Sequence, residues 1–356
     1  MKNKDIWIIS ETENQFQDNG FTFFKYMRRN YPQKNVYYVI DKKVQDLKKL
    51  EIYGNILYFN SFKSIYYLFG ATKIISTHGI WMLPQELGIF RKQSKKMLKA
   101  EKIMLQHGIT ALKNVGNAYN KNKFFLNNKF IVSSKLEKEI IKKYLDYEEE
   151  NIVLSGMPRL DELKDESNKE EFKILYMPTY RKNIKTEKEF LISDFYIKSK
   201  SFLENIIKLD SKIKIDFYLH KEFQKYIKYY QIDNKNIEIK KNYLTLKGSL
   251  KKCNLLITDF SSVCFDFLFM GKPILFYLMD EEAYKVKKNS YMDYDKYFKS
   301  IAFSKEEELI KEIKKIINNE INKYKFLKLK KVFFEYDDNK NCERLYKEIK
   351  SNKKFK

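Results

Sequence analysis

The sequence has few of the residues that would mark a disulfide-bonded, zinc-binding or membrane-spanning protein. Only three of its 356 residues are cysteines, and no two have C-x-x-C spacing. Cys253 and Cys264 lie in apolar surroundings, so we expect buried free thiols in a reducing cytoplasm. No stretch approaches the roughly 18 uninterrupted apolar residues that a membrane helix needs. The apolar run Ile6–Ile9 is too short for a signal peptide, so we expect a protein that is soluble or peripheral to a membrane.

The sequence also lacks the usual signatures of nucleotide, metal and nucleic-acid binding. There is no glycine-rich P-loop and no G-x-G-x-x-G, so a bound nucleotide would have to be held in another way. No cluster of Asp and Glu demands a metal, so we expect no tightly bound cofactor and leave only loosely bound Mg²⁺ open. No RNA- or DNA-binding motif is present.

Charge is the strongest compositional signal that is present. The chain carries 70 basic and 47 acidic residues, a formal net charge of +23. Such a balance predicts an anionic partner, which can be a nucleic acid, a membrane surface or a polyanionic substrate. Part of the excess is the Lys bias of an AT-rich genome, so charge does not choose among these partners. The length and the 44% hydrophobic content predict two domains with sizeable cores.

Short apolar runs alternate with longer amphipathic segments rich in Lys and Glu. This βαβ rhythm is typical of an α/β protein. Helices are predicted after Phe303, over 305–319 and 323–350. The runs that we expect to form strands are Ile6–Ser10, Val36–Ile40, Ile56–Phe59, Lys73–Ser76, Lys102–Gln106, Lys129–Val132, Asn151–Leu154, Lys173–Met177, Lys214–Leu219, Ile237–Lys240, Asn254–Thr258 and Pro273–Tyr277.

A change in composition divides the chain near its middle. Ser155–Asp161 contains a Gly-x-Pro break, and the charged segment Asp165–Glu171 follows, which is a reasonable hinge between domains. We therefore expect domains at 1–164 and 165–320 and a basic helical tail at 321–356. A second basic run, Arg91–Lys96, is either a solvated helix face or a platform for a polyanionic acceptor or anionic lipid.

Polar residues follow five of the predicted strands, at the point where each strand ends. In an open α/β sheet, ligands bind at the carboxyl ends of the strands. All three histidines of the chain occupy such positions. The residues concerned are His78, His107, Thr179, Arg181, His220, Asp259, Ser261 and Ser262.

The serine pair after Asp259 has two interpretations. Ser261 and Ser262 are either ordinary helix N-caps or, with the free N–H groups of a helix start, a grip for a phosphate. Asp266, about a turn further on, either faces a ribose or is a solvated helix charge.

The other candidates also have a plain alternative. Arg181 can make bidentate contacts to phosphate, but among 70 basic residues it is equally an ordinary surface residue. His220 is either a ligand contact or a loop histidine with a satisfied hydrogen bond. His107, directly before Gly108, is well placed for general-base work near neutral pH, and His78 has a similar setting with a weaker case.

Several short motifs occur in order along the chain. They are Gln106-His107-Gly108, Gly156-x-Pro158-Arg159-x-Asp161, Pro178-Thr179-x-Arg181, Thr258-Asp259-Phe260-Ser261-Ser262-Val263-x-Phe265-Asp266 and Lys272-Pro273-Ile274-Leu275-Phe276-Tyr277. Together they resemble the motifs of the CDP-glycerol glycerophosphotransferases, the teichoic-acid primase and polymerase family, which has relatives in capsule synthesis. The resemblance covers roughly residues 100–280. Two positions depart from it: many members have Trp-His-Gly-Thr where this chain has Gln106–Ile109, and Tyr where it has Phe260.

The resemblance implies a GT-B architecture, with two Rossmann-like domains facing across a cleft. The N-terminal domain would bind the acceptor, with His78 and Gly108 on that side, and the C-terminal domain would bind the CDP-linked donor. The resemblance further implies that His107 is the catalytic base and that His220 acts near the pyrophosphate. The residues that it places at the donor and its phosphates are Thr179, Arg181, Thr258, Asp259, Ser261, Ser262 and Asp266. We expect no long membrane-targeting extension.

The expected reaction is transfer of a polyol phosphate, glycerol phosphate first, from a CDP donor to an acceptor hydroxyl during synthesis of a capsule or teichoic-acid-like polymer. CMP would be released. The expected partners are the CDP donor, an anionic or lipid-linked glycan acceptor and an anionic membrane surface at the cytoplasmic side, with no nucleic acid. Two alternatives stay open: a GT-B glycosyltransferase that uses a nucleotide sugar, and a nucleic-acid-binding protein, which the charge alone would explain.

Overall fold

The computed structural model describes residues 5–79, 81–82, 97–120, 128–168, 170–210, 212–241, 246–322 and 324–350. The chain divides into two compact units. The N-terminal unit comprises Met1–Ile109, Val115–Glu162 and Phe333–Lys356, and the C-terminal unit comprises Thr110–Asn114 and Leu163–Val332. The basic run Arg91–Lys96 lies outside the described residues.

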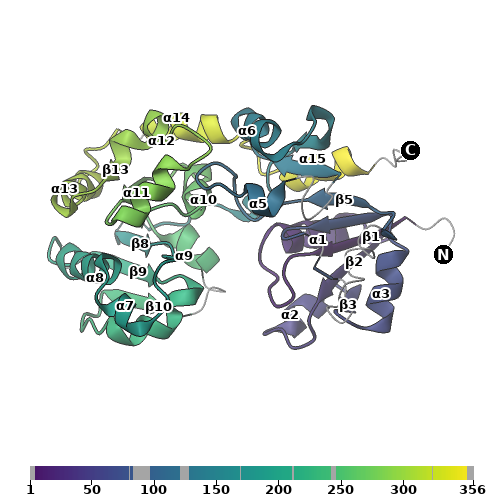
Figure 1. The fold of residues 1–356 in the computed structure, drawn as a ribbon, viewed down its shortest axis with the longest axis horizontal. Coiled ribbons are helices and arrows are strands. Elements are labelled where there is room, and N and C mark those ends of the chain that lie inside the picture. Colours follow the sequence, from purple (N-terminus) through teal and green to yellow (C-terminus); the bar gives the residue numbers. More distant parts are fainter. Residues whose placement is uncertain are drawn as a thin grey trace. The chain divides into compact units, whose positions relative to one another are not determined.

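The N-terminal unit is built on a parallel sheet of seven strands in the order β3-β2-β1-β4-β5-β6-β7. Figure 1 labels β1, β2, β3 and β5 of this sheet. The strands are β1 Ile6–Ser10, β2 Asn35–Ile40, β3 Ile56–Tyr58, β4 Lys73–Ser76, β5 Glu101–Met104, β6 Lys129–Val132 and β7 Ile152–Leu154. The helices are α1 Asn19–Asn30, α2 Leu47–Glu51, α3 Phe62–Phe69, α5 Gly116–Tyr119, α6 Lys135–Leu145, α15 Asn341–Ile349 and the 3-10 helices η3 Glu149–Asn151 and η4 Pro158–Glu162. Two apolar clusters form its core: side chains of α1 and α15 pack in one, and Leu68 of α3 packs in the other.

The C-terminal unit repeats this plan with six parallel strands in the order β10-β9-β8-β11-β12-β13. The strands are β8 Lys173–Met177, β9 Lys214–Tyr218, β10 Ile237–Lys240, β11 Leu255–Thr258, β12 Ile274–Tyr277 and β13 Ala302–Phe303. The helices are α7 Glu187–Leu191, α8 Asp194–Ile206, α9 Leu246–Lys252, α10 Val263–Phe269, α11 Glu281–Lys288, α12 Tyr294–Phe298, α13 Glu306–Ile317, α14 Tyr324–Phe333 and the 3-10 helices η5 Lys221–Tyr229 and η7 Lys299–Ile301.

Local sequence explains most of these elements. The central strands are apolar and buried on both faces, as parallel strands covered by helices require. Helix starts are set by side-chain caps: the Ser134 hydroxyl accepts the N–H of Glu137 at α6, and Thr186 forms a capping box with Glu189 at α7. The predicted α/β class, with a Rossmann-like sheet in each half, is confirmed.

Three predictions about elements need correction. The short strand β13 carries little apolar signal and was not predicted. The helix predicted over 323–350 is two helices, α14 and α15, because Asn339 adopts a left-handed φ of 54° in the polar stretch between them. The expected separate tail at 321–356 does not exist as a unit, because Phe333–Lys356 belongs to the N-terminal unit.

Contacts to the loop after β7 hold α15 in the N-terminal unit. The carboxylate of Asp161 accepts the backbone N–H groups of Asn341 and Cys342, each at 2.8 Å, at the start of that helix. Gly156 approaches so closely that an added Cβ would lie 2.1 Å from Oδ1 of Asn341, and its φ of +78° also favours glycine.

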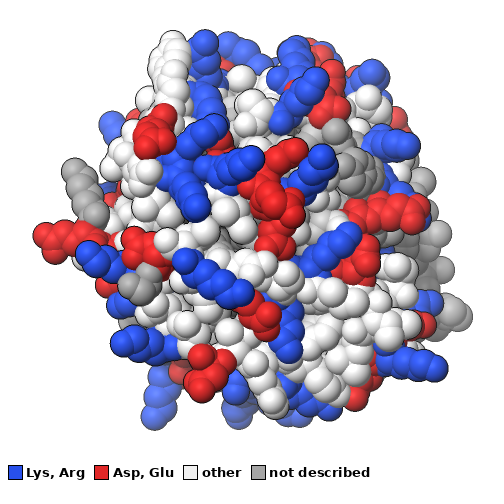
Figure 2. All heavy atoms as spheres, turned by 90° about the vertical axis from the view of Figure 1, so that its left-hand side faces the viewer, with Lys and Arg blue, Asp and Glu red and all other residues white. Residues whose placement is uncertain are grey.

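The basic residues do not form one continuous field on the face that Figure 2 shows. Lys and Arg are dispersed there among Asp, Glu and neutral side chains. All three cysteines are buried and unbonded, as predicted. Among the described residues, no helix combines the length and the apolar composition needed to cross a membrane.

Candidate active site

Both sheets place polar residues at the point where their strand order reverses. In the N-terminal sheet this switch lies between β1 and β4, and in the C-terminal sheet between β8 and β11. Loops that leave the carboxyl ends of two such strands diverge and open a crevice, which is where open α/β sheets bind ligands. His78 follows β4, Arg181 follows β8 and Asp259 follows β11, so these three lie beside the switch points. His107 and His220 follow β5 and β9, the strands next to β4 and β8.

His107 follows β5 at a strained turn of the N-terminal unit. Gln106 before it has a φ of 48°, which residues other than glycine rarely adopt. The buried Gln106 amide donates to the carbonyl of Ile131 and to Oε1 of Glu137, both at 2.8 Å. The backbone carbonyl of Gln106 accepts a hydrogen bond from Nδ2 of Asn19 at 2.8 Å. Strain that is held by so many contacts is typical of functional sites.

Two aromatic neighbours fix the His107 ring. Its Nδ1 lies 2.7 Å from the hydroxyl of Tyr119, and it stacks on His78 at a centroid distance of 5.0 Å and an angle of 15°. Burial, and then the charge of Asp18, raise the pKa of Tyr119, so this hydroxyl stays protonated at neutral pH. If the hydroxyl accepts the Nδ1 proton, Nε2 carries the lone pair that a general base needs.

The loop after β1 contains a buried carboxylate. Glu11 accepts the backbone N–H groups of Gln17 at 2.8 Å and of Asp18 and Phe21 at 2.7 Å. Burial first, and the charge of Asp18 second, raise the pKa of Glu11 to about 8, although the three N–H groups oppose this shift. Glu11 therefore ties the loop together and titrates close to physiological pH.

Arg159 of η4 links this loop to His107. Its Nη1 donates to Oδ1 of Asp18 at 2.9 Å and to the carbonyl oxygen of His107. Its backbone N–H donates to Oδ1 of Asn19 at 3.0 Å. The loops after β1, β5 and β7 are thus joined around His107.

In the C-terminal unit, Arg181 joins the loops after three strands. Its Nη1 donates to Oδ2 of Asp259, after β11, and its Nε donates to Oδ2 of Asp280, after β12, both at 2.7 Å. Asp259 also accepts the backbone N–H groups of Thr179 at 3.0 Å and of Phe260 at 2.6 Å. Burial alone would raise the pKa of Asp259, but the charge of Arg181 and its hydrogen bond outweigh burial and hold that pKa below its ordinary value.

Arg181 itself is only 2% exposed, which bears on its predicted role. Its Nη2 is buried and finds no hydrogen-bond partner in the described part of the chain. It lines a hollow of about 400 Å³ whose wall includes Glu189, Asp194 and Asp280. Those acidic neighbours disfavour a phosphate there, so the geometry suits a residue that orders loops.

His220 follows β9 and is half-buried. Its Nδ1 accepts the backbone N–H of Glu222 at 3.3 Å, and its ring stacks on Tyr180 at 5.5 Å and 24°. Burial, and then the charges of Lys113 and Lys221, lower the pKa of His220. With Nδ1 accepting, the ring is neutral and carries its proton on Nε2, where it can donate to an anion.

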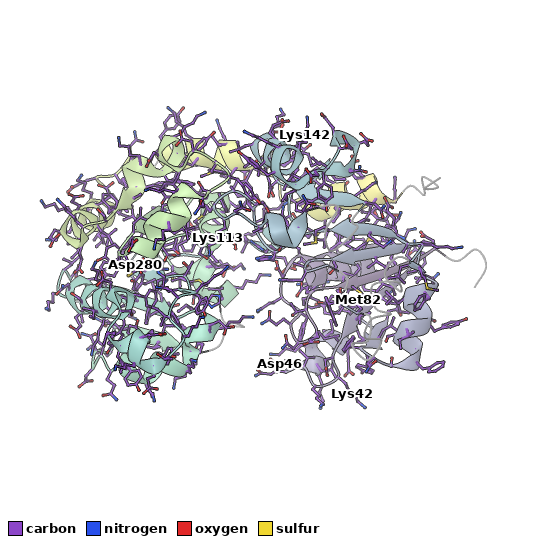
Figure 3. The ribbon with its side chains drawn as sticks, in the orientation of Figure 1. Lys42, Asp46, Met82, Lys113, Lys142 and Asp280 are labelled. Atoms are coloured by element: carbon purple, nitrogen blue, oxygen red, sulfur yellow. The ribbon has the colours of Figure 1, made fainter. Side chains whose placement is uncertain are left out.

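Lys113, which is labelled in Figure 3, brings a cation of the C-terminal unit close enough to His220 to lower the pKa of that histidine. Its segment is held by Tyr291, whose N–H donates to the carbonyl of Ala111 at 3.1 Å and whose hydroxyl donates to Asn114 at 2.9 Å. Lys113 reaches solvent, yet the surrounding protein removes enough water to lower its pKa, and Arg181 adds to the shift.

The serine pair lies directly before α10. Both residues are half-buried, and the Ser261 hydroxyl accepts the N–H of Val263 at 3.4 Å, a long cap contact. Ser262 makes no side-chain cap hydrogen bond. Ordinary N-capping therefore does not account for Ser262.

Two predicted donor residues do not lie at the solvent-accessible edge. The hydroxyl of Thr258 donates to the carbonyl of Met177 at 2.6 Å and is buried. Asp266 is buried on α10, so its interpretation as a solvated helix charge is wrong. Gly108 is buried beside His107.

Some functional candidates escaped the sequence reasoning. Glu11 and Asp280 follow predicted strands, so the strand-end rule could have found them. Arg159 stands in the motif Gly156-x-Pro158-Arg159-x-Asp161 but was given no role. Tyr119, Asp18 and Lys113 carried no signal in the sequence. In the described ranges, no group of three or more His, Cys, Asp or Glu side chains is arranged to hold a metal ion.

Sequence comparison identifies the family. Residues 1–351 match the sequence model of the family described as CDP-Glycerol:Poly(glycerophosphate) glycerophosphotransferase. The minor teichoic acid biosynthesis protein GgaB of Bacillus subtilis (strain 168) is 30% identical over 366 aligned positions, covering 97% of this chain and 40% of that protein. The teichoic acid glycerol-phosphate primase of the same strain is 26% identical, covering 74% of this chain and 72% of the primase.

Solved structures show the fold. The wall teichoic acid polymerase TagF superposes with a TM-score of 0.72 at 19% identity, covering 96% of this chain and 87% of that one. A putative UDP-N-acetylglucosamine 2-epimerase from Listeria monocytogenes superposes with a TM-score of 0.61 at 14% identity, covering 98% of this chain and 96% of that one. The predicted GT-B class is confirmed by these matches together with the two parallel sheets.

The chain spans about half the length, or less, of the first curated relatives that it matches, 40% of GgaB and 48% of a poly(ribitol-phosphate) polymerase from Bacillus spizizenii. The family model nevertheless covers the sequence almost from end to end. The chain therefore belongs to the CDP-glycerol:poly(glycerophosphate) glycerophosphotransferase family.

Proposed function

We propose that this protein transfers a polyol phosphate, glycerol phosphate first, from a CDP-linked donor to an acceptor hydroxyl and releases CMP. The observation that carries the proposal is His107, whose ring nitrogen is fixed by Tyr119 at the ligand-binding edge of a sheet in a chain of this family. The similar polymerase TagF has also been solved after soaking with CDPG, with a TM-score of 0.70 to this chain.

His107 acts as the general base in this proposal. Nδ1 donates to the Tyr119 hydroxyl, and Nε2 takes the proton of the acceptor hydroxyl. The acceptor oxygen then forms a bond to the distal phosphorus of the donor, while the bond from that phosphorus to the bridging oxygen breaks and CMP leaves with the electron pair. The proton passes from His107 to solvent.

The C-terminal unit meets the negative charge of the two phosphates. His220 donates from Nε2, Lys113 contributes its ammonium, and Ser261 and Ser262 contribute hydroxyls. Arg181 acts indirectly, because its ion pairs with Asp259 and Asp280 set the loops that carry these groups. No tightly bound metal takes part, and added EDTA should leave turnover unchanged.

The acceptor is an anionic or lipid-linked glycan, and the protein works at the cytoplasmic face of the cell membrane, where such an acceptor is available. The net charge of +23 supports this, because it attracts both an anionic polymer and anionic lipid.

The test is CMP release from CDP-glycerol with a lipid-linked acceptor. His107→Ala should reduce turnover by about 10²–10⁴-fold. Calorimetry should show that this variant still binds CDP-glycerol, because the donor groups lie in the other unit. Lys113→Met should instead weaken donor binding, whereas the exposed neighbour variant Lys182→Met should not. Unchanged turnover in His107→Ala would contradict the base assignment.

A nucleotide-sugar enzyme is the second candidate, because the epimerase named above shares the fold. Calorimetric titration with CDP-glycerol, CDP-ribitol, UDP- and GDP-sugars separates the two. Binding of a UDP- or GDP-sugar without binding of either CDP-polyol would favour the alternative.

A further inference from the structure

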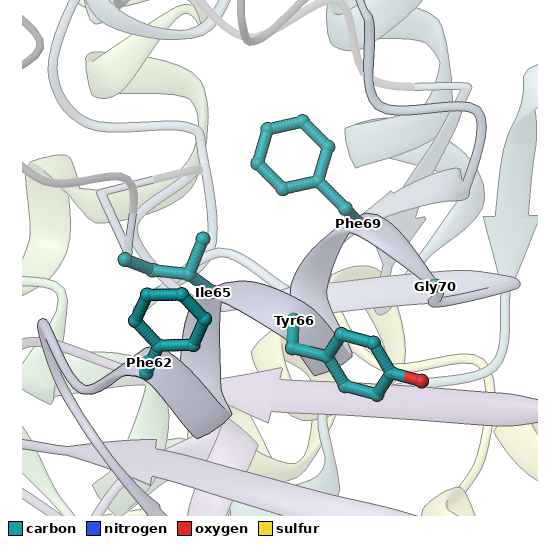
Figure 4. A pocket seen from close by; sticks show the side chains of 5 residues that line it. All are labelled: Phe62, Ile65, Tyr66, Phe69 and Gly70. Carbon is teal, nitrogen blue, oxygen red and sulfur yellow. The ribbon is translucent and has the colours of Figure 1, made fainter.

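The outer face of α3 in the N-terminal unit is apolar. Phe62, Ile65, Tyr66 and Phe69 follow one another at helical spacing, and we call these four residues the α3 ridge. Phe62 is 93% exposed, Tyr66 57% and Phe69 43%, while Ile65 is half-buried. Figure 4 shows their side chains projecting from one helix around a hollow of about 480 Å³.

The core of the unit does not explain the ridge. Ser61 caps α3, and the helix packs inward through Ser64 and Leu68, which are buried. Leu68 joins the apolar cluster around Ile8 and Leu57. A surface helix needs only this one apolar side. The ridge therefore adds exposed apolar surface that folding does not require, and such surface marks an interaction site.

We propose that the α3 ridge inserts into the surface of an anionic lipid bilayer. Phe and Tyr rings are suited to the boundary between headgroups and acyl chains, where an amphipathic helix lies with its apolar face buried by ~5–10 Å. Lys63 is the single charged residue of α3, and no acidic residue of the helix opposes an anionic surface. The net charge of +23 draws the chain to the same surface.

A second copy of this chain fits the ridge less well. Each copy would carry +23, so two copies repel one another. The ridge also offers too little area: four partly exposed side chains of ~150–250 Å² each supply roughly half of the ~800 Å² per partner that a stable protein interface buries. A bilayer needs no such area, because a few inserted rings add to the electrostatic attraction.

This inference deepens the proposed function and rests on it for the expectation of a membrane-bound acceptor. Its test needs no turnover, so the two can fail separately. The ridge belongs to the unit that also carries His107, and α3 begins after the carboxyl end of β3, at the edge of the sheet where His107 follows β5.

The test measures binding of the full chain to vesicles of phosphatidylglycerol and phosphatidylcholine by co-sedimentation at 0.05 and 0.5 M NaCl, concentrations chosen because screening is strong only at the higher one. The wild type should remain bound at high salt. Phe62→Ser/Tyr66→Ser/Phe69→Ser should lose at least about tenfold in its high-salt partition coefficient, while its low-salt binding through charge persists.

The matched control is Tyr324→Ser/Leu327→Ser on α14, a pair that is 56% and 45% exposed in the other unit. It should bind like the wild type. A second measurement uses Phe62→Cys labelled with an environment-sensitive dye, which is selective because the three native cysteines are buried. The dye should shift to the blue on vesicles.

Three results would overturn the proposal. The first is a wild type that leaves the vesicles at high salt. The second is unchanged vesicle binding of the ridge variant at high salt, or a loss of high-salt binding in the α14 control variant instead of the ridge variant. The third is an oligomer in sedimentation velocity that the ridge variant alone abolishes, which would assign the ridge to a second copy.

Discussion

Replacing Arg181 by methionine should destabilise the C-terminal unit strongly. Methionine keeps an unbranched apolar stem similar to the aliphatic part of the arginine side chain and removes the guanidinium. Arg181 holds Asp259 and Asp280 through two hydrogen bonds of 2.7 Å, and the exposed fractions of the three side chains are 3%, 0% and 10%. The substitution leaves Asp259 charged and buried, with backbone N–H groups and the charge of Lys113 left to stabilise it.

The size of the effect follows from this burial. Removing one partner of a buried ion pair costs about 3–5 kcal/mol, because the other charge stays uncompensated. Asp259 keeps its hydrogen bonds from backbone N–H groups, so we expect the loss in free energy of unfolding to lie in the lower half of that range. With a urea dependence of about 1–3 kcal/mol per M, the unfolding midpoint should fall by about 1–4 M.

The pH dependence has a defined sign. In the wild type the pKa of Asp259 is held below its ordinary value, so its contribution to stability is present above the unfolded pKa of ~3.9 and is lost as pH falls below it. In Arg181→Met, burial raises this pKa instead, and protonation relieves the buried charge. The difference in free energy of unfolding between the wild type and Arg181→Met should therefore become smaller as pH falls from 7 towards 4.

The assay can distinguish the two units. Both tryptophans, Trp7 and Trp81, belong to the N-terminal unit, so tryptophan fluorescence follows that unit, while circular dichroism follows both. The dichroism midpoint should move and the fluorescence midpoint should not. Lys182→Met changes an exposed neighbour, so its free energy of unfolding should stay within about 0.5 kcal/mol of that of the wild type. Adding Asp259→Asn should restore part of the stability that Arg181→Met loses. A cost below about 1 kcal/mol for Arg181→Met would refute this reasoning.

Three further changes test other parts of the molecule. Tyr119→Phe should lower CMP release by about tenfold or more and shift its pH profile without weakening CDP-glycerol binding, because it removes only the contact to Nδ1 of His107; an unmoved pH profile would refute the tautomer role. Gly156→Ala should destabilise the N-terminal unit by about 1–3 kcal/mol, read by tryptophan fluorescence, because its φ is +78° and its Cβ would meet Asn341; an unchanged midpoint would contradict this. The pKa of Glu11 is raised from 4.5 to about 8, so Glu11 holds its proton more tightly in the folded state than in the unfolded state. The free energy of unfolding of the wild type should therefore fall as pH rises from 5 to 8. Urea titrations at these two pH values should show that Glu11→Gln loses this pH dependence.

The strands were the most predictable part of the fold. Ile6–Ser10, Lys73–Ser76, Lys129–Val132 and Lys173–Met177 were predicted with the bounds that the structure shows, because a short run of apolar and β-branched residues between polar segments specifies its own extended backbone. The break between α14 and α15 was missed. The left-handed Asn339 in the polar stretch is a local cause, but the start of α15 is also held by its contacts with Asp161, far away in the sequence.

The candidate site was predictable only in outline. That His107, Arg181 and Asp259 follow strands was visible, since strand ends follow from local pattern, and parallel sheets gather such ends on one edge. The partners of these residues were not visible. Arg181 and Asp280 are 99 residues apart, and Arg159 and His107 are 52 apart. For this reason a predicted phosphate ligand, Arg181, is found holding two carboxylates.

The sequence by itself determined the α/β class, the two-domain plan, the strand-end positions of the polar residues and the family. These properties follow from periodicity and short motifs, which act over a few residues of backbone. Only the tertiary structure decided that residues 110–114 join the C-terminal unit, that α15 returns to the N-terminal unit, and which charges are paired and buried. The physical reason is that burial and pairing depend on the order and register of strands, which bring together side chains whose separation in the sequence carries no signal of contact.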